Sequence, residues 1–417
     1  MLKKEKFLYI LCIIFFISFF LPVFVVLKVI SMSALGAFCL IFPFIKPVTP
    51  IRPFREQLFF CVAFAVWILL SVLWSDDKSD ASRYITLRLP LMLLPFTIGL
   101  VNISRNLRNR ILLTFSYIVL FGTLISALYA FYHGYTEGNP AWLYNDYLSL
   151  LINQQSIYTS VLVNIAIYTL VWFLWNSRKR SEKTVYGFSI AILLVLSFLL
   201  ASRNMMAILY LSIVAISIYL IVKKKKYILG GSVFAGVIAL VAVVFTFFPK
   251  TLNRFRELKF TSYEFTREAP ESHYAGNLDS GQWNGANFRL AAWSCGWELF
   301  KEHPVTGVGI GDKRNELIKV YEERNFKFAI RTKKNVHNNY LDILFSLGAI
   351  GFLLFFIGWL LLPIWKMARS KDLLAIWITG TFALAMITEV YFDRSLGGLL
   401  VGFFIPFLLV SRNDNQA

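Results

Sequence analysis

Charged residues are scarce in this chain: Asp, Glu, Lys and Arg make up only 16% of its 417 residues, against about 25% in soluble domains. Acidic residues are the rarer kind, with 24 Asp and Glu against 42 Lys and Arg, and the formal net charge is +18. Hydrophobic residues account for 57% of the chain. This composition excludes a soluble globular protein and a disordered chain.

Cysteine is also rare, with four in the whole chain. Three of them, Cys12, Cys39 and Cys61, lie in long apolar runs, and Cys295 stands alone in a more polar region. This distribution excludes a disulfide-rich secreted scaffold, and no zinc-ligand spacing is present. We therefore expect no structural disulfide.

Long apolar runs are what the chain has in abundance. A hydrocarbon core about 30 Å thick is crossed by about 20 apolar residues in a helix. Open strands cannot satisfy their backbone groups in lipid, so the spans are expected to be helices. The sequence predicts an all-α polytopic membrane protein with about twelve transmembrane helices, two within 7–45 and the others near 57–74, 84–101, 111–132, 155–175, 185–201, 204–222, 227–248, 339–362, 373–391 and 396–411.

The basic residues are concentrated on one side of these spans. With the N-terminus inside, the inner loops carry 21 Lys and Arg, the short outer loops and span ends carry six, and the long loop carries 15. Short cytoplasmic loops concentrate Lys and Arg, so both termini are expected in the cytoplasm. The chain then divides into helices one to nine (1–248), a large external loop (249–338), and helices ten to twelve with a cytoplasmic tail (339–417). Membrane topology therefore explains most of the excess of basic residues, and we predict no nucleic-acid partner.

The large external loop contains a predicted helix over 287–302. Its apolar residues Phe288, Ala292, Trp293, Trp297 and Phe300 recur near one side. Such a helix either lies on the membrane surface or packs on the bundle.

Three polar residues are expected at the outer membrane boundary. The apolar run 185–222 is broken only at residues 202–204, so Arg203 is expected in a very tight external turn between two spans. His337 opens the tenth span in VHNNYLDILFSLGAIG, where Asn338 or Asn339 can cap the helix. Arg289 lies in the loop motif NFRLAAW. An ionisable residue at this depth suggests a functional site, although an interfacial anchor or a polar helix entrance is the alternative for each.

Weaker signals surround these residues. The stretch HPVTGVGIGD, with Gly307, Gly309 and Gly311, forms either an anion-binding set of backbone amides or a plain turn. The acidic cluster Asp76, Asp77 and Asp80 either binds a divalent cation or is a solvated loop. At the end of span eleven, residues Glu389, Asp393 and Arg394 pair with one another or orient the basic site.

The motif RLAAWSCGWELFKEHPVTGVGIGD, followed by a basic stretch and VHNNYLDILFSLGAIG, resembles the O-antigen ligase and O-antigen polymerase superfamily. The resemblance covers the architecture of the whole chain, and its motifs are concentrated in residues 200–351. It implies a glycosyltransferase-C-like enzyme of the bacterial inner membrane, with a periplasmic active site and no metal or other cofactor. The implied donor is a glycan on undecaprenyl diphosphate, and the implied acceptor is the lipid A–core oligosaccharide.

The resemblance also implies residue roles. Arg203, Arg289 and His337 match the family's catalytic positions, the two arginines as diphosphate binders and the histidine as a base. Arg256, Arg331, Lys333 and Lys334 are further candidates for attracting anionic substrate, with a solvated loop charge as the alternative for each. Tyr340 and Trp293 are candidate platforms for sugar rings, with structural packing as the alternative.

Other functions remain open at this stage. Polymerases that join repeat units, and protein O-oligosaccharyltransferases, share the superfamily's motifs and differ in their acceptor. A glycolipid transporter or flippase is the alternative from another class, because twelve spans are common in carriers. Carriers usually have two matching halves with a site near the midplane, whereas the candidate residues here cluster at one face and a long loop makes the halves unequal.

Overall fold

The structure is a computed structural model of the chain and describes residues 3–21, 25–45, 52–101, 103–223, 225–247, 256–269 and 281–410. Within these ranges the secondary structure is helical, with no β-strand. The all-α class is therefore confirmed. The predicted boundary at residue 248 and most of the predicted tail, residues 411–417, lie outside the described residues.

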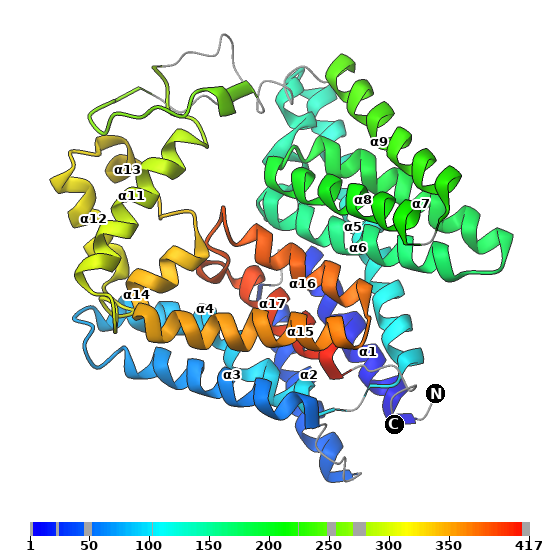
Figure 1. Cartoon of the computed structure of the whole chain (residues 1–417), viewed down its shortest axis with the longest axis horizontal. Helices are drawn as coiled ribbons and strands as arrows, with labels where there is room; N and C mark the ends of the chain where they lie inside the picture. The colour runs from blue at the N-terminus through cyan, green and yellow to red at the C-terminus, as the bar shows by residue number, and fades with distance from the viewer. Residues whose placement is uncertain are drawn as a thin grey trace.

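The helices follow one another in the order shown in Figure 1. The first part of the chain forms α1 (Lys3–Ile17), α2 (Val25–Ile45), α3 (Arg52–Leu70), α4 (Lys78–Thr97), α5 (Arg105–Thr136), α6 (Ser156–Asn176), α7 (Arg180–Leu199), α8 (Arg203–Val222) and α9 (Tyr227–Phe247). The predicted loop contains α11 (Asn287–Glu302), α12 (Lys313–Glu323) and α13 (Lys327–Thr332). The last part forms α14 (Asn339–Phe355), a π-helical turn (Phe356–Leu361), α15 (Leu362–Arg369), α16 (Leu373–Ala385) and α17 (Ser395–Val410).

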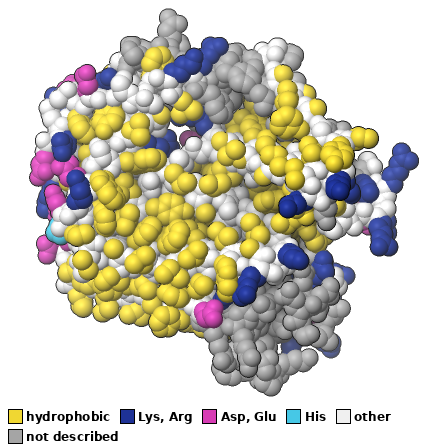
Figure 2. Space-filling view, viewed as in Figure 1, with side chains coloured by type: hydrophobic (Ala, Val, Ile, Leu, Met, Phe, Trp, Pro, Cys, Tyr) yellow, Lys and Arg dark blue, Asp and Glu magenta, His cyan; other side chains and the backbone are white. Residues whose placement is uncertain are grey.

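Each predicted span falls on one of the helices outside the loop. Five described stretches are long and apolar enough to cross a membrane, namely α5, α6, α7, α8 and the continuous stretch Asn339–Arg369. Shorter apolar helices are Val26–Ile41, Glu56–Leu70, Leu373–Ala385 and Ser395–Val410. Large apolar side chains such as Phe59, Phe121 and Phe188 are exposed on this bundle, and Figure 2 shows a broad apolar surface over it. The chain is a multi-pass membrane protein, and the count of twelve crossings stays a prediction.

Helix α17 lies at the centre of the described bundle. Its residues from Leu396 to Val410 are all buried, and it packs closely along α4. A Cβ atom at Gly398 or Gly402 would lie within 3 Å of the α4 carbonyl oxygens of Leu87 and Pro90. Small residues one helical turn apart therefore let the two backbones approach, as is common between membrane helices.

The described part of the loop that the sequence predicts to be external packs around a second apolar core, to which Leu341 and Phe345 of α14 also belong. Trp283, Phe288, Phe326 and Phe328 pack together in this core. Helix α11 confirms the helix predicted over 287–302 and packs on α14, as one of the two predicted arrangements requires. The predicted apolar side was wrong at Trp297, which is 50% exposed.

The loop is joined to α14 where that helix is interrupted. Gly348 has φ 68° and ψ −175° inside α14, a conformation that favours glycine. The interruption exposes backbone groups on which the loop forms hydrogen bonds: Val308 N–H donates to Phe345 O at 2.9 Å, and Ala349 N–H donates to Pro304 O at 2.9 Å. This loop and the part of α14 around Gly348 are therefore bonded along their backbones.

The same bonds decide between the two interpretations of the glycine-rich stretch. The amides of Gly307, Gly309 and Gly311 donate to His303 O, Ser346 O and Ser75 Oγ. These amides are used inside the protein, so the anion-binding interpretation is wrong and the stretch is a turn.

The acidic cluster at the start of α4 also has a structural role. Asp77 caps α4 by accepting from Asp80 N–H, and Asp312 accepts from Asp76 N–H at 2.7 Å and Asp77 N–H at 2.8 Å. Asp80 pairs with Arg83 at 3.3 Å. Among the residues that the structure describes, no group of three or more His, Cys, Asp and Glu side chains could hold a metal ion.

Four charged side chains, three of them buried, connect α4, α12, α14 and the short 3-10 turn Tyr391–Asp393 before α17. Lys313 Nζ lies 2.8 Å from Asp342 Oδ1 and 2.6 Å from Asp393 Oδ1. Arg88 Nη2 lies 3.1 Å from Asp342 Oδ2. Arg88, Lys313 and Asp342 are at most 3% exposed. The sequence places Arg88 at an outer span end, whereas the structure buries it in this balanced network of two cations and two carboxylates.

Replacing Asp342 with Asn is expected to destabilise the protein by about 3–5 kcal/mol, because it leaves Arg88 and Lys313 sharing one carboxylate in a buried place. Unfolding of the purified protein in detergent, followed by heat or denaturant, measures the loss. Asp80→Asn is the matched control: its pair with Arg83, which is 53% exposed, is expected to contribute at most about 1 kcal/mol. Equal stability of the two variants would contradict a structural role for the buried network.

Candidate active site

Arg203 lies in the tight turn that the sequence predicts. Helix α7 ends at Leu199 and α8 begins at Arg203. The chain reverses through Ala201, whose φ of 48° is in the left-handed region. Arg203 is therefore the first residue of its helix and reaches a cavity at the end of the bundle.

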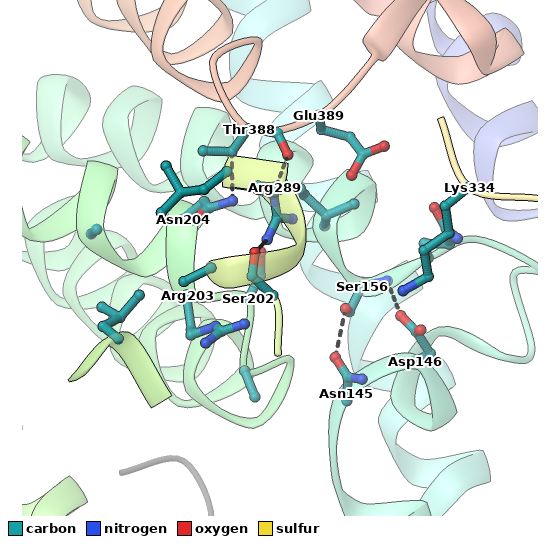
Figure 3. A pocket seen from close by; sticks show the side chains of 18 of the residues that line it. Asn145, Asp146, Ser156, Ser202, Arg203, Asn204, Arg289, Lys334, Thr388 and Glu389 are labelled. Atoms are coloured by element: carbon teal, nitrogen blue, oxygen red, sulfur yellow. Dashed lines mark hydrogen bonds between the residues drawn. The ribbon is translucent and has the colours of Figure 1, made fainter. Parts of the chain in front are cut away.

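This cavity, called here the first cavity, has a volume of about 800 Å³. Its walls come from the α5–α6 connection, the start of α8, the loop helices α11 and α13, and the segment after α16 (Figure 3). It is lined by Asn145, Asp146, Gln155, Ser156, Ile157, Ala201, Ser202, Arg203, Asn204, Ala207, Leu258, Gly285, Ala286, Arg289, Leu290, Trp293, Phe328, Arg331, Thr332, Lys334, Thr388 and Glu389. The loop thus folds back over the bundle and brings Arg289 to the cavity that Arg203 lines.

The two arginines approach one point beside Gly285. A Cβ atom at Gly285 would lie 2.4 Å from Arg203 Nη2 and 3.0 Å from Arg289 Nη1. Glycine therefore leaves room for two guanidinium groups at this position. Two like charges held this close favour an anion between or beside them.

Thr388, in the segment after α16, is hydrogen-bonded to both helices that carry the arginines. Arg289 donates from Nε to Thr388 O at 3.0 Å and from Nη1 to Gly285 O at 2.5 Å. Asn204, next to Arg203, donates from Nδ2 to Thr388 Oγ1 at 2.5 Å. Thr388 therefore fixes α8 and α11 relative to each other, as Figure 3 shows.

His337 lies just before α14, as predicted. Asn338 caps that helix by accepting from the amides of Tyr340 and Leu341 at 3.0 and 3.1 Å. His337 has φ 48°, and its own N–H donates to Asn335 Oδ1 at 3.0 Å. The cap and this bond turn the imidazole away from the helix axis and toward the segment after α16.

The imidazole of His337 is paired with a carboxylate. Its Nδ1 lies 3.1 Å from Glu389 Oε2. With Glu389 ionised, the Nδ1–H group donates a hydrogen bond to the carboxylate, and in that tautomer Nε2 is an acceptor. Burial raises the pKa of Glu389, but the charge and hydrogen bond of His337 and the charge of Arg289 outweigh this and hold the pKa below its usual value.

His337 faces a second cavity of about 440 Å³. The two cavities share four lining residues, namely Gln155, Thr332, Lys334 and Glu389. Arg203 and Arg289 therefore line one cavity and His337 the other, and Glu389 lies where the two meet.

The other predicted site residues divide between cavity wall and core. Arg331 and Trp293 line the first cavity. The buried Nε1 of Trp293 has no hydrogen-bond partner among the described residues. Tyr340 lines neither cavity: its hydroxyl donates to Ala383 O at 2.6 Å, and its ring lies near Phe352 and Phe355.

The sequence indicates Lys334 only as one of several basic loop residues that could attract anionic substrate, and it gives no indication of Thr388. Lys334 lies with its ammonium 4.9 Å from the Phe288 ring centre and 5.3 Å from that of Phe328, and it lines both cavities. Thr388 acts through a backbone carbonyl as well as a hydroxyl, so its residue type alone carries no signal.

Replacing Glu389 with Gln is expected to reduce stability at neutral pH, because the pair of Glu389 with His337 loses its charge. A carboxyl group with a lowered pKa stabilises the fold above its ordinary pKa, and this contribution is lost as the pH falls through the lowered value. The difference in unfolding temperature between wild type and Glu389→Gln should therefore persist from neutral pH down to the ordinary pKa of Glu, about 4.3, and shrink as the pH falls below it. A difference that stays constant as the pH falls below about 4 would contradict the pairing.

Two comparisons with known proteins bear on this site. Residues 190–356 match a family model described as O-antigen ligase. That range contains Arg203, Arg289 and His337, whereas Thr388 and Glu389 lie beyond it. No curated protein matches the chain significantly.

Proposed function

We propose that this chain, which belongs to the O-antigen ligase superfamily of glycosyltransferase-like membrane enzymes, transfers an O-antigen-type glycan from undecaprenyl diphosphate to the lipid A–core oligosaccharide. The reaction takes place at the periplasmic face of the bacterial inner membrane. One observation carries the proposal: two arginines converge on a cavity that adjoins a carboxylate-paired histidine.

The first cavity suits the diphosphate of the donor. A guanidinium group is planar, remains charged, and matches phosphate oxygens with two parallel hydrogen bonds. Arg203 and Arg289 bind the diphosphate in this mechanism, with Arg331 on the same wall attracting it. The leaving diphosphate gains one negative charge in the reaction, so both arginines bind it more strongly in the transition state than in the ground state.

His337 acts as the base. Its Nε2 accepts the proton of an acceptor sugar hydroxyl while Glu389 holds Nδ1–H and stabilises the imidazolium that forms. The hydroxyl oxygen forms a bond to the anomeric carbon, and the bond from that carbon to the diphosphate oxygen breaks. Attack occurs opposite the leaving group, so the configuration at the anomeric carbon inverts.

The magnitudes are adequate for an enzyme. A charged hydrogen bond contributes about 1.5–3 kcal/mol, so two arginines acting in the transition state supply a factor of about 10²–10⁴ in rate. A positioned base supplies about 10²–10⁴ more. Holding two lipid-anchored substrates in contact supplies the remainder. These residues need no metal ion, so transfer in the presence of EDTA is part of the proposal.

Deletion of the gene in its native host tests this function. A ligase mutant retains long glycan on undecaprenyl diphosphate and loses capped lipopolysaccharide. A ladder shortened to a single capped repeat would instead identify a polymerase, and unglycosylated target proteins would identify a protein O-oligosaccharyltransferase. Movement of glycolipid across proteoliposomes without a new glycosidic bond would identify a transporter.

A further inference from the structure

We propose that the second cavity binds the acceptor and selects a saccharide that carries phosphate groups. The inference rests on the proposed transferase function and assigns its acceptor side. It depends on three features of the structure: the place of His337, the state of the acidic residues around it, and a surplus of cations on the cavity wall.

The place of His337 separates the two substrates. A general base must lie within hydrogen-bond reach of the hydroxyl that it deprotonates. His337 lines the second cavity, whereas Arg203 and Arg289 line the first. The acceptor hydroxyl therefore approaches from the second cavity, and the donor diphosphate lies in the first.

The carboxylates that line the second cavity are already matched by cations. Asp342 and Asp393 are bonded to Lys313, with Arg88 behind them. Glu389 is paired with His337. None of the three is therefore available to neutralise the other cations on the wall.

Apart from Arg83, which pairs with Asp80, and Lys334, which both cavities share, the other cations on the wall come from three separate elements. Arg314 lies in the first turn of α12, Lys333 follows α13, and Arg394 precedes α17, and all three line the cavity. Among the described residues, none of the three forms an ion pair with a carboxylate within 4.0 Å. A phosphate group carries close to two negative charges and three acceptor oxygens, so it matches several cations converging from different elements better than a neutral sugar does.

Steady-state kinetics with the full chain in lipid nanodiscs tests the assignment. The two probes are lipid A–core oligosaccharide with its phosphates intact and the same acceptor after chemical dephosphorylation. The variant Arg314→Gln/Lys333→Asn removes two charges, and Asn suits the φ of 49° at position 333. We expect the acceptor KM to rise about tenfold for the phosphorylated probe, as for the loss of a charged hydrogen bond, with the donor KM unchanged.

With the wild type, the acceptor KM of the dephosphorylated probe should exceed that of the phosphorylated probe by the same factor. The double variant should not raise the KM of the dephosphorylated probe any further. This comparison within the wild type stands even where the variant does not fold. Lys319→Gln, on the same helix but exposed and paired with Glu316, is the matched control and should change neither KM. An unchanged acceptor KM, or a rise in the donor KM alone, would overturn the proposal.

Binding separates failure of this inference from failure of the proposed function. A wild type that forms no product with any acceptor refutes the transferase function itself. Calorimetry with phosphorylated core oligosaccharide released from lipid A then measures the site directly, and weaker binding by the double variant supports the cavity. Binding of only the form that retains lipid A would locate the recognised phosphates on the lipid and overturn the saccharide assignment.

Discussion

Replacing His337 with Ala is expected to lower the rate of glycan transfer by about 10²–10⁴-fold, because the acceptor hydroxyl then has no base. In the proposed mechanism the imidazole of His337, and not its partner Glu389, accepts the proton of the acceptor hydroxyl. Transfer by purified protein, measured with saturating donor and acceptor, reports the change in kcat.

His303→Ala is the matched control for this experiment. His303 is exposed and lines neither cavity, and its backbone takes part in the turn between α11 and α12. Its replacement should leave kcat within about twofold, since exposed substitutions usually have small effects. Full activity of His337→Ala at unchanged expression would remove the base assignment.

The second large effect is expected when either arginine becomes lysine. Arg289→Lys keeps the charge but loses the Nε bond to Thr388 O and the planar fork for phosphate. We expect a fall of about 10- to 100-fold in kcat/KM for the donor, as for one or two charged hydrogen bonds. Arg203→Lys should behave alike, and the effects of the two substitutions should not add, because both groups act on one diphosphate.

Arg324→Lys tests whether such a loss is specific to the cavity. Arg324 lies in the same loop, but its side chain is 49% exposed and its guanidinium group donates to both carboxylate oxygens of Glu298. This substitution should leave the donor kinetics unchanged. A similar loss in all three lysine variants would indicate that the loop's general stability, and not diphosphate binding, accounts for the effect.

The positions of Arg203 and His337 follow from local sequence, because each is set by a helix boundary. A short polar break in an apolar run predicts the turn at Arg203, and an Asn-capped apolar run predicts the helix start after His337. The convergence of Arg289 on Arg203 is not local. It depends on a folded external core around Trp283 and on bonds to Thr388, 99 residues further along the chain.

The buried charges illustrate the same limit. Arg88 and Asp342 are separated by 254 residues, and no periodic pattern connects them. Hydropathy alone places an arginine of an apolar span at the outer end of that span. Arg88 is buried instead because the fold supplies Asp342 as its partner. The role of Glu389 was open for the same reason, since an acidic residue after a span has no fixed partner until the fold supplies His337.

The interruption of α14 at Gly348 has a mechanical consequence. The loop is bonded to the helix on both sides of that glycine, so a displacement of the loop displaces the first half of α14 with it. Asn338 and His337 stand at the start of that half. Any movement of this loop that admits a lipid-linked substrate therefore carries the base with it, and the bonds of Thr388 to Asn204 and Arg289 carry the start of α8 along as well.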